Sequence, residues 1–171
     1  GVKKRWFLLA LVLGVAAVII VWPHVPGYIQ GRFTVVIDHI TGNPDTYVEQ
    51  TQGRGWQQTR SILAIGSGGL FGQGYLQGTQ TQSASEEALP ARHTDEIFAV
   101  CGEEFGMAGC ILVILLLTAI ILRCVWVARR ANSPMAAYVA MGYAAMLLLQ
   151  TVINIGMCLY VFPVVGLTLP F

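Results

Sequence analysis

The stretch FGMAGCILVILLLTAIIL, from Phe105 to Leu122, decides the fold of this chain. It contains no charged residue, and an apolar run of about 18 residues or more can form a helix that crosses a bilayer. The composition of the whole chain agrees. Of its 171 residues 55% are hydrophobic and only 11% are charged, whereas an ordinary soluble domain has about 25% charged residues. We therefore predict an all-α, polytopic membrane protein.

Two further apolar stretches flank this one, at residues 6–22 and 136–161. A secretory signal peptide is the competing interpretation of the first stretch. No small-residue cleavage site follows it, however, and it ends in Trp22 and Pro23, so we predict a helix that is retained. The sequence thus predicts three transmembrane helices.

The charged residues are distributed unevenly along the chain. Six of the ten Lys and Arg residues lie in two clusters, at 3–5 and 123–130, whereas all nine acidic residues lie between Asp38 and Glu104. Short basic loops stay in the cytoplasm, so both clusters should be inside, and no nucleic-acid partner is expected. The predicted order is a cytoplasmic stub (1–5), a transmembrane helix (6–22), a long extracellular loop (23–94), a helix with an extramembrane start (95–122), a cytoplasmic loop (123–135), a third helix (136–161) and an extracellular segment (162–171).

The long loop has three parts. Its first part is rich in helix breakers such as Pro26 and Gly42, and we predict irregular backbone there. Residues 56–65 have the pattern of a short helix lying in the membrane interface. The glycine-rich run 66–78 also contains apolar residues, which indicates backbone that turns tightly against protein or lipid. A phosphate cradle is the alternative, but the run has no P-loop spacing.

The boundary between this loop and the second span reads LPARHTDEIFAV, from Leu89 to Val100. We identify Asp95 as the candidate catalytic residue, because a carboxylate at the water–lipid boundary can act as a base on a substrate that is itself half lipid. The structural alternative is that Thr94 caps the helix and that Asp95 and Glu96 favour its first turn. One carboxylate can serve in both roles.

Four other ionisable residues are candidates for substrate binding. Arg60 and Arg92 would suit a pyrophosphate, since guanidinium groups bind phosphate oxygens well, although ordinary surface pairing explains them equally well. His93 is a candidate because it neighbours Asp95. Glu103 lies just before an apolar run, where a carboxylate needs partners or a wet cavity. No metal-ligand spacing is present, so no metal site is predicted.

The third span carries two polar residues, Gln150 and Asn154, one helical turn apart. Polar side chains at this depth should face protein, because an unsatisfied polar group in hydrocarbon is costly. We therefore expect this helix to pack on others. Both ends of the chain look cut, so we expect a fragment of a larger multi-span protein.

The chain contains the motifs QQTRS (57–61), AIGSGGLFGQG (64–74), GTQTQ (78–82), LP (89–90), HTD (93–95), IFAV (97–100), GEE (102–104), NIGM (154–157) and PVVGLTLP (163–170). Taken together, these motifs closely resemble those of the SEDS family, the RodA/FtsW/SpoVE proteins, and within it the RodA-like members. Two features depart from the family pattern: Glu96 stands where the family usually has Phe, and residues 83–88 are unusually acidic. A second carboxylate beside Asp95 should raise one of the two pKa values or create a cation site.

The resemblance implies a bundle of about ten helices, of which this chain would be a piece of the C-terminal half, inactive alone, in the bacterial plasma membrane. It implies polymerisation of lipid II into β-1,4 glycan strands with inversion, release of undecaprenyl pyrophosphate, and Asp95 as the essential base. A class B penicillin-binding protein would be the partner, in elongation, division or sporulation. No cofactor is firmly expected, and a divalent cation is one source of the positive charge that the leaving group needs. The alternatives are a lipid II transporter and a non-catalytic scaffold.

Overall fold

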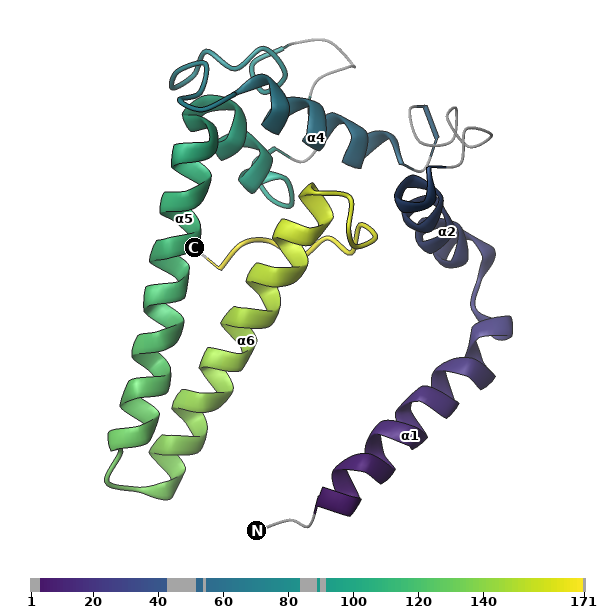
Figure 1. Ribbon diagram of the computed structural model, residues 1–171, viewed down its shortest axis with the longest axis vertical. Coiled ribbons are helices and arrows are strands. Elements are labelled where there is room, and N and C mark those ends of the chain that lie inside the picture. Colours follow the sequence, from purple (N-terminus) through teal and green to yellow (C-terminus); the bar gives the residue numbers. More distant parts are fainter. Residues whose placement is uncertain (1–3, 43–51, 54, 84–88, 90–91, 171) are drawn as a thin grey trace.

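The computed structural model describes residues 4–42, 52–53, 55–83, 89 and 92–170. Within these ranges the chain is helical and has no strand, which confirms the all-α prediction (Figure 1). The elements are α1 (Lys4–Val21), the short 3-10 helix η1 (Trp22–His24), α2 (Gly27–Thr41), α4 (Trp56–Ser67), α5 (Ile97–Arg130) and α6 (Pro134–Cys158).

Two helices, α5 with 34 residues and α6 with 25, are long and apolar enough to cross a membrane. They lie side by side (Figure 1), and the side chain of Ser133 begins α6 by accepting a hydrogen bond from the Ala136 amide at 3.2 Å. A third span would combine residues 11–24 with α2, two segments bent by 113° relative to each other. The structure therefore has two or three candidate membrane spans, where the sequence predicted three, and the bend follows the predicted first span.

The prediction of irregular backbone after Pro23 is wrong for residues 27–41, which form α2. The breakers lie at helix ends and not inside a loop. Pro26 directly precedes α2, where a fixed φ suits a helix start. Gly42 ends α2 with φ 69°, a conformation that glycine adopts without strain. The short helix predicted at 56–65 is confirmed as α4.

Both ends of α5 differ from the prediction. The helix begins at Ile97 and not at Thr94, and residues 92–96 form turns, so Thr94 is not its N-cap. At the other end α5 continues to Arg130, through most of the loop predicted at 123–135. The guanidinium groups of Arg123 and Arg130 stack on the ring of Trp126, at 4.2 and 4.4 Å from its centroid. These contacts support helical backbone where charge alone indicated a loop.

Helix α5 is broken at Gly106, whose φ of 67° and ψ of −163° lie outside the helical region. A break of this kind removes the intrahelical partners of the neighbouring amides and carbonyls. The glycine-rich loop replaces them. The amides of Gln73 and Gly74 donate to the carbonyls of residues 103 and 104, at 2.9 and 3.0 Å, and the amides of Met107 and Ala108 donate to the carbonyls of residues 69 and 70, at 2.9 and 3.1 Å.

Close backbone contact explains two glycines of this loop, Gly68 and Gly72. A Cβ atom on Gly68 would overlap the carbonyl oxygen of Gly102, and one on Gly72 would overlap that of Glu104. Only glycine allows two backbones to approach so closely. The prediction of tight turning against protein is therefore confirmed, and the loop serves to close the break in α5.

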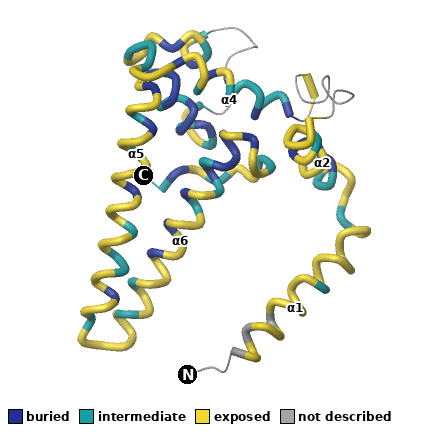
Figure 2. Tube along the Cα trace, in the orientation of Figure 1, coloured by how far each residue is buried: buried dark blue, intermediate teal, exposed yellow. Residues whose placement is uncertain are grey.

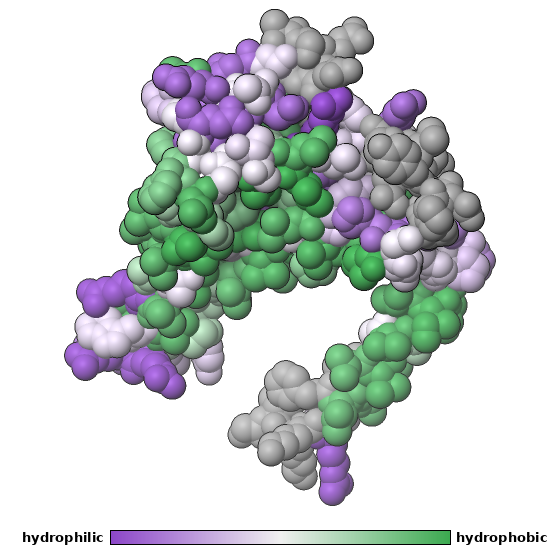
Figure 3. All heavy atoms as spheres, turned by 45° about the horizontal axis from the view of Figure 1, so that its top comes forward, coloured by the Kyte–Doolittle hydropathy of each residue, from purple (hydrophilic) through white to green (hydrophobic). Residues whose placement is uncertain are grey.

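Buried residues gather where α4, the start of α5 and the end of α6 meet, whereas α1 and most of α5 and α6 are exposed (Figure 2). Figure 3 shows hydrophobic surface over the middle of the molecule with hydrophilic surface beyond it. The start of α1 and the turn between α5 and α6 lie at the same end (Figure 1). Lipid or further helices must cover these apolar faces, as in a membrane protein.

Candidate active site at the start of α5

Asp95 is half-buried in the turn directly before α5. Its main-chain carbonyl accepts a hydrogen bond of 2.8 Å from Nδ2 of Asn154 on α6. The same Nδ2 donates to the carbonyl of Leu167 at 2.6 Å. Asn154 is fully buried, so the prediction that it faces protein is confirmed. One α6 side chain thus fixes both the Asp95 turn and the C-terminal segment.

The carboxylate of Asp95 faces this C-terminal segment. A Cβ atom on Gly166 would lie 3.3 Å from Oδ2 of Asp95, and Gly166 has φ 71°. A larger residue at position 166 would therefore be strained and would crowd the carboxylate. Sequence reasoning did not place Gly166 at the site, because the two residues are far apart in the chain.

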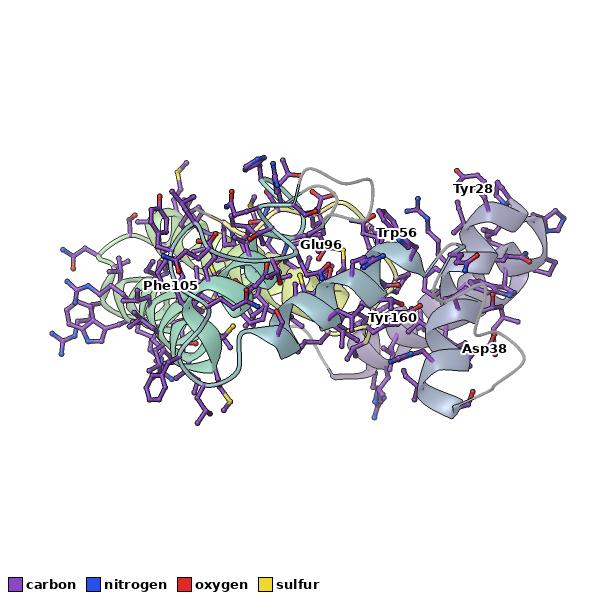
Figure 4. All side chains as sticks on the ribbon, turned by 90° about the horizontal axis from the view of Figure 1, so that it is seen from above. Tyr28, Asp38, Trp56, Glu96, Phe105 and Tyr160 are labelled. Carbon is purple, nitrogen blue, oxygen red and sulfur yellow. The ribbon has the colours of Figure 1, made fainter. Side chains whose placement is uncertain are left out.

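Glu96, the next residue, is fully buried beside α4 (Figure 4). Oε1 accepts a hydrogen bond of 3.1 Å from Nε2 of Gln57. Oε2 contacts the hydroxyl of Ser61 and lies 3.3 Å from Sγ of Cys158. Gln57 and Ser61 come from α4 and Cys158 comes from the last turn of α6, so Glu96 joins three elements directly behind Asp95.

Burial raises the pKa of Glu96 above its ordinary value, and the charge of Asp95 raises it further, against the lowering effect of the three contacting side chains. The prediction that adjacent carboxylates would shift one pKa therefore holds for Glu96, with burial as the main cause. Among the described residues, no three His, Cys, Asp or Glu side chains are grouped to hold a metal ion. The oxygens of Glu96 are in contact with the side chains of Gln57, Ser61 and Cys158.

Glu103 is also fully buried, and it has the partners that the sequence analysis required. Oε1 accepts hydrogen bonds from the amide of Gln80 at 2.7 Å, from Oγ1 of Thr79 at 3.2 Å and from Oγ of Ser67 at 3.5 Å. Oε2 accepts from the amide of Thr81 at 2.8 Å. Glu103 therefore anchors residues 79–81, and these contacts account for its burial.

The loop that Glu103 anchors reaches back towards Asp95. Nη1 of Arg92 donates to the carbonyl of Thr81. Nε of Arg92 lies 3.3 Å from Nε2 of His93, which is exposed. Arg92 and His93 are thus held in the turn that carries Asp95, whereas Arg60 lies half-buried on α4, next to Ser61.

Besides Gly166, three residues of this site were not identified from the sequence. Gln57 and Ser61 stand one turn apart on α4, a spacing that places both on one helix face. That spacing was a usable signal for a polar contact. Cys158 gave no such signal, because a lone cysteine in an apolar helix is usually a small packing residue.

The fold and this site define a membrane protein with a carboxylate at the end of a membrane-spanning helix. The sequence model of the family FTSW_RODA_SPOVE, described as "Cell cycle protein", matches residues 1–171. The chain belongs to this family, which confirms the resemblance drawn from its motifs.

Relatives with assigned names agree. The chain is 37% identical over 171 residues to "Peptidoglycan glycosyltransferase MrdB" of Escherichia coli (strain K12), covering 99% of this chain and 43% of that protein. It is 46% identical over 122 residues to "Probable peptidoglycan glycosyltransferase FtsW" of Coxiella burnetii, covering 70% and 32%. It is 39% identical over 123 residues to "Stage V sporulation protein E" of Bacillus subtilis, covering 72% and 32%.

A solved structure described as "Structural coordination of polymerization and crosslinking by a peptidoglycan synthase complex" is similar in fold. The TM-score is 0.66 at 25% identity, over 98% of this chain and 42% of that chain. The chain therefore spans less than half the length of these relatives.

Proposed function

We propose that this chain is part of a peptidoglycan glycosyltransferase that makes β-1,4 glycan strands from lipid II, with Asp95 as its general base. The observation that carries the proposal is the placement of Asp95. Its carboxylate stands at the end of a membrane-spanning helix, partly exposed, on a turn that the buried Asn154 fixes from behind. A base for a lipid-linked sugar must stand at this boundary, because the sugar is in water while its carrier is in lipid.

In the proposed reaction, Asp95 takes the proton from the 4-hydroxyl of an acceptor GlcNAc. The oxygen attacks C1 of the donor MurNAc, a new C–O bond forms, and the bond from C1 to the diphosphate breaks with its electron pair. Undecaprenyl pyrophosphate leaves, and the α-linked donor gives a β-linked product. A single base can serve this inversion, since the leaving diphosphate needs little protonation.

Charge that develops on the diphosphate needs positive or hydrogen-bonding groups. We propose that Arg92 is one such group, a role supported by the contact of its guanidinium with the carbonyl of Thr81, in the loop that Glu103 holds. We propose His93 as a second contact and Arg60 as a more distant one on α4. The described residues form no carboxylate cluster for a divalent cation, and the proton transfer needs only Asp95.

Transport of lipid II is the competing function, and it relied on Gln150 and Asn154 as parts of a polar path. Both hydrogen bonds recorded for the Asn154 side chain go to main-chain carbonyls of residues 95 and 167. Packing therefore accounts for Asn154, which favours the polymerase over the transporter.

The same proposal includes the partner and the orientation. The structural neighbour described as a peptidoglycan synthase complex supports a class B penicillin-binding protein as the partner. The arginines at the end of α5 lie at the same end of the molecule as the start of α1 (Figure 1), which supports a cytoplasmic location for that end and an extracellular location for α4 and the glycine-rich loop.

The test uses the full-length protein with its penicillin-binding partner and purified lipid II. Asp95→Asn keeps the size of the side chain and removes the base. We expect glycan polymer to fall by at least about a hundredfold, in line with loss of a general base. Complex formation and thermal stability should stay unchanged. Thr94→Ala, next in the chain and exposed, is the matched control and should retain activity.

Undiminished polymer from Asp95→Asn would contradict the polymerase mechanism. Movement of lipid II across vesicles by this variant, with no polymer from wild type or variant, would support transport. Loss of polymer only where the variant fails to bind its partner would support a scaffold.

A further inference from the structure

The carboxyl group of Glu96 lies next to Asp95 and contacts three other side chains, but the proposed reaction does not use it. It is fully buried and contacts α4 through Gln57 and Ser61 and α6 through Cys158. In the described part of the chain, the groups acting on it are these three side chains and the charge of Asp95. None of them is a cation.

The hydrogen atoms available around Glu96 favour a protonated acid. The hydroxyl of Ser61 has one hydrogen and two neighbours able to accept it, Oε2 of Glu96 and the carbonyl of Gln57 at 3.2 Å. If Glu96 carries the proton, Oε2 donates to Ser61 and Ser61 donates to the carbonyl, so each group is satisfied. The thiol of Cys158 is only a weak donor. An anion at Oε2 would therefore be poorly stabilised.

Glu103 shows the contrast within the same molecule. Two backbone amides and the hydroxyl of Thr79 donate to its carboxylate, while the hydroxyl of Ser67, 3.5 Å away, also has the carbonyl of Ala64 as an acceptor at 2.8 Å. That set can stabilise a buried negative charge through charge-assisted hydrogen bonds. Among the side chains described around Glu96, the side-chain amide of Gln57 is the one strong donor whose hydrogen is not shared with another acceptor. The two buried glutamates therefore differ in the number of N–H and O–H donors around them.

We propose that Glu96 is a positioning residue for Asp95, acting as a protonated buried acid that joins α4 and α6 behind the Asp95 turn. This rests on the proposed function for its effect on catalysis. The neutral acid leaves Asp95 as the only negative charge in the turn, so that Asp95 stays the base. It also fixes the backbone from which the Asp95 side chain projects, together with the bond from Asn154 to the Asp95 carbonyl.

The pH dependence of the protein's stability follows from the direction in which the pKa of Glu96 is shifted. Burial raises the pKa of Glu96 in the folded protein above the ordinary 4.5. A raised folded pKa means that the stabilisation is complete below the unfolded value and is lost as pH rises through the folded value. Asp95 and Cys158 are the titratable groups that face Glu96, and Ser61 and Gln57 are neutral. Loss of stability on the alkaline side is thus the signature of Glu96.

The test compares Glu96→Gln with Glu96→Ala in the full-length protein with its partner. Glutamine has nearly the same shape as the protonated acid. Like that acid, it offers one acceptor oxygen and one hydrogen-bond donor group. We expect Glu96→Gln to polymerise lipid II within about threefold of wild type at neutral pH. Glu96→Ala should lose more activity or stability. Between about pH 5 and about pH 9, the thermal stability of wild type should fall relative to Glu96→Gln as pH rises.

Two outcomes would overturn the proposal. One is a folded Glu96→Gln that loses polymerase activity as completely as Glu96→Ala. The other is a stability difference between wild type and Glu96→Gln that does not change with pH. If Glu96→Ala does not fold, Ser61→Ala replaces it as the variant that weakens the contact. The stability measurement needs no catalysis, so an active Asp95→Asn would overturn the proposed function and leave this result standing.

Discussion

Four carboxyl groups lie at the start of α5, and each of them has a different environment. Asp95 is partly exposed beside the C-terminal segment, and Glu96 is enclosed by polar but uncharged side chains. Glu103 binds the backbone of residues 79–81, and Glu104 accepts a single recorded hydrogen bond, from Nε2 of Gln82 at 3.2 Å. The sequence alone shows four acids, but only the structure shows that Asp95 is partly exposed while the other three are buried.

Substituting Glu103→Gln should release the loop that reaches Arg92. An amide keeps one acceptor oxygen but turns an NH2 group towards the backbone amide of either Gln80 or Thr81, and leaving such a buried group unsatisfied costs about 1–3 kcal/mol. Hydrogen exchange at residues 79–82 should become faster. Glu104→Gln is the matched control, since one side-chain bond is at stake there. Equal protection in both variants would show that Glu103 does not anchor the loop.

At the scale of elements, the broken helix α5 is the feature that positions the site. The apolar run in the sequence predicted that α5 spans the membrane. The helix breakers Pro26 and Gly42 lie at the two ends of α2. The break at Gly106 could not be read from the sequence, because Phe105 to Leu122 looks uninterrupted. The break depends on the loop at residues 69–74, whose amides and carbonyls hydrogen-bond to the backbone of α5 on both sides of Gly106. The glycine run predicted tight turning, but its partner was visible only in three dimensions.

Gly106→Ala should destabilise the protein by about 1–3 kcal/mol or more, because its φ of 67° strains any residue with a Cβ. The added methyl group would also overlap the amide of Gly72. Gly142→Ala on α6 is the control. No atom lies within 4 Å of its added Cβ, and alanine in a helix gains up to about 1 kcal/mol over glycine. Thermal unfolding in detergent measures both. Equal melting temperatures would contradict the described break.

Asn154→Leu should loosen the contact between α6 and the Asp95 turn. The carbonyls of residues 95 and 167 would lose their shared donor, at a cost of about 1–3 kcal/mol. We expect a lower polymerisation rate and a lower melting temperature. Gln150→Leu, one turn earlier and only half-buried, is the control and should change both much less. A normal rate in Asn154→Leu would show that Asp95 needs no support from α6.

At the scale of the whole molecule, the exposed apolar faces of α1, α5 and α6 indicate that lipid or further helices surround this part of the protein (Figure 2). The sequence predicted this from composition, and charge predicted the orientation of the ends. The sharp turn between α1 and α2 was not predictable, since hydropathy shows where a span lies and not how it bends.

The orientation predicts which positions a membrane-impermeant maleimide can reach in a full-length protein without its native cysteines. Phe71→Cys, at an 85% exposed position in the glycine-rich loop, should react in intact spheroplasts. Ser133→Cys, in the turn between α5 and α6, should react only after the membrane is opened. The reverse pattern would place the site in the cytoplasm and contradict the proposed orientation.

The most direct measurement is the rate of glycan polymerisation from purified lipid II by Asp95→Asn and Glu96→Gln, each in the full-length protein with its partner. Each variant replaces a carboxyl group by an amide of nearly equal shape, in adjacent residues. We predict that Asp95→Asn loses polymerisation while Glu96→Gln retains it. An active Asp95→Asn, or the loss of polymerisation in Glu96→Gln alone, would contradict the assignment of Asp95 as the base.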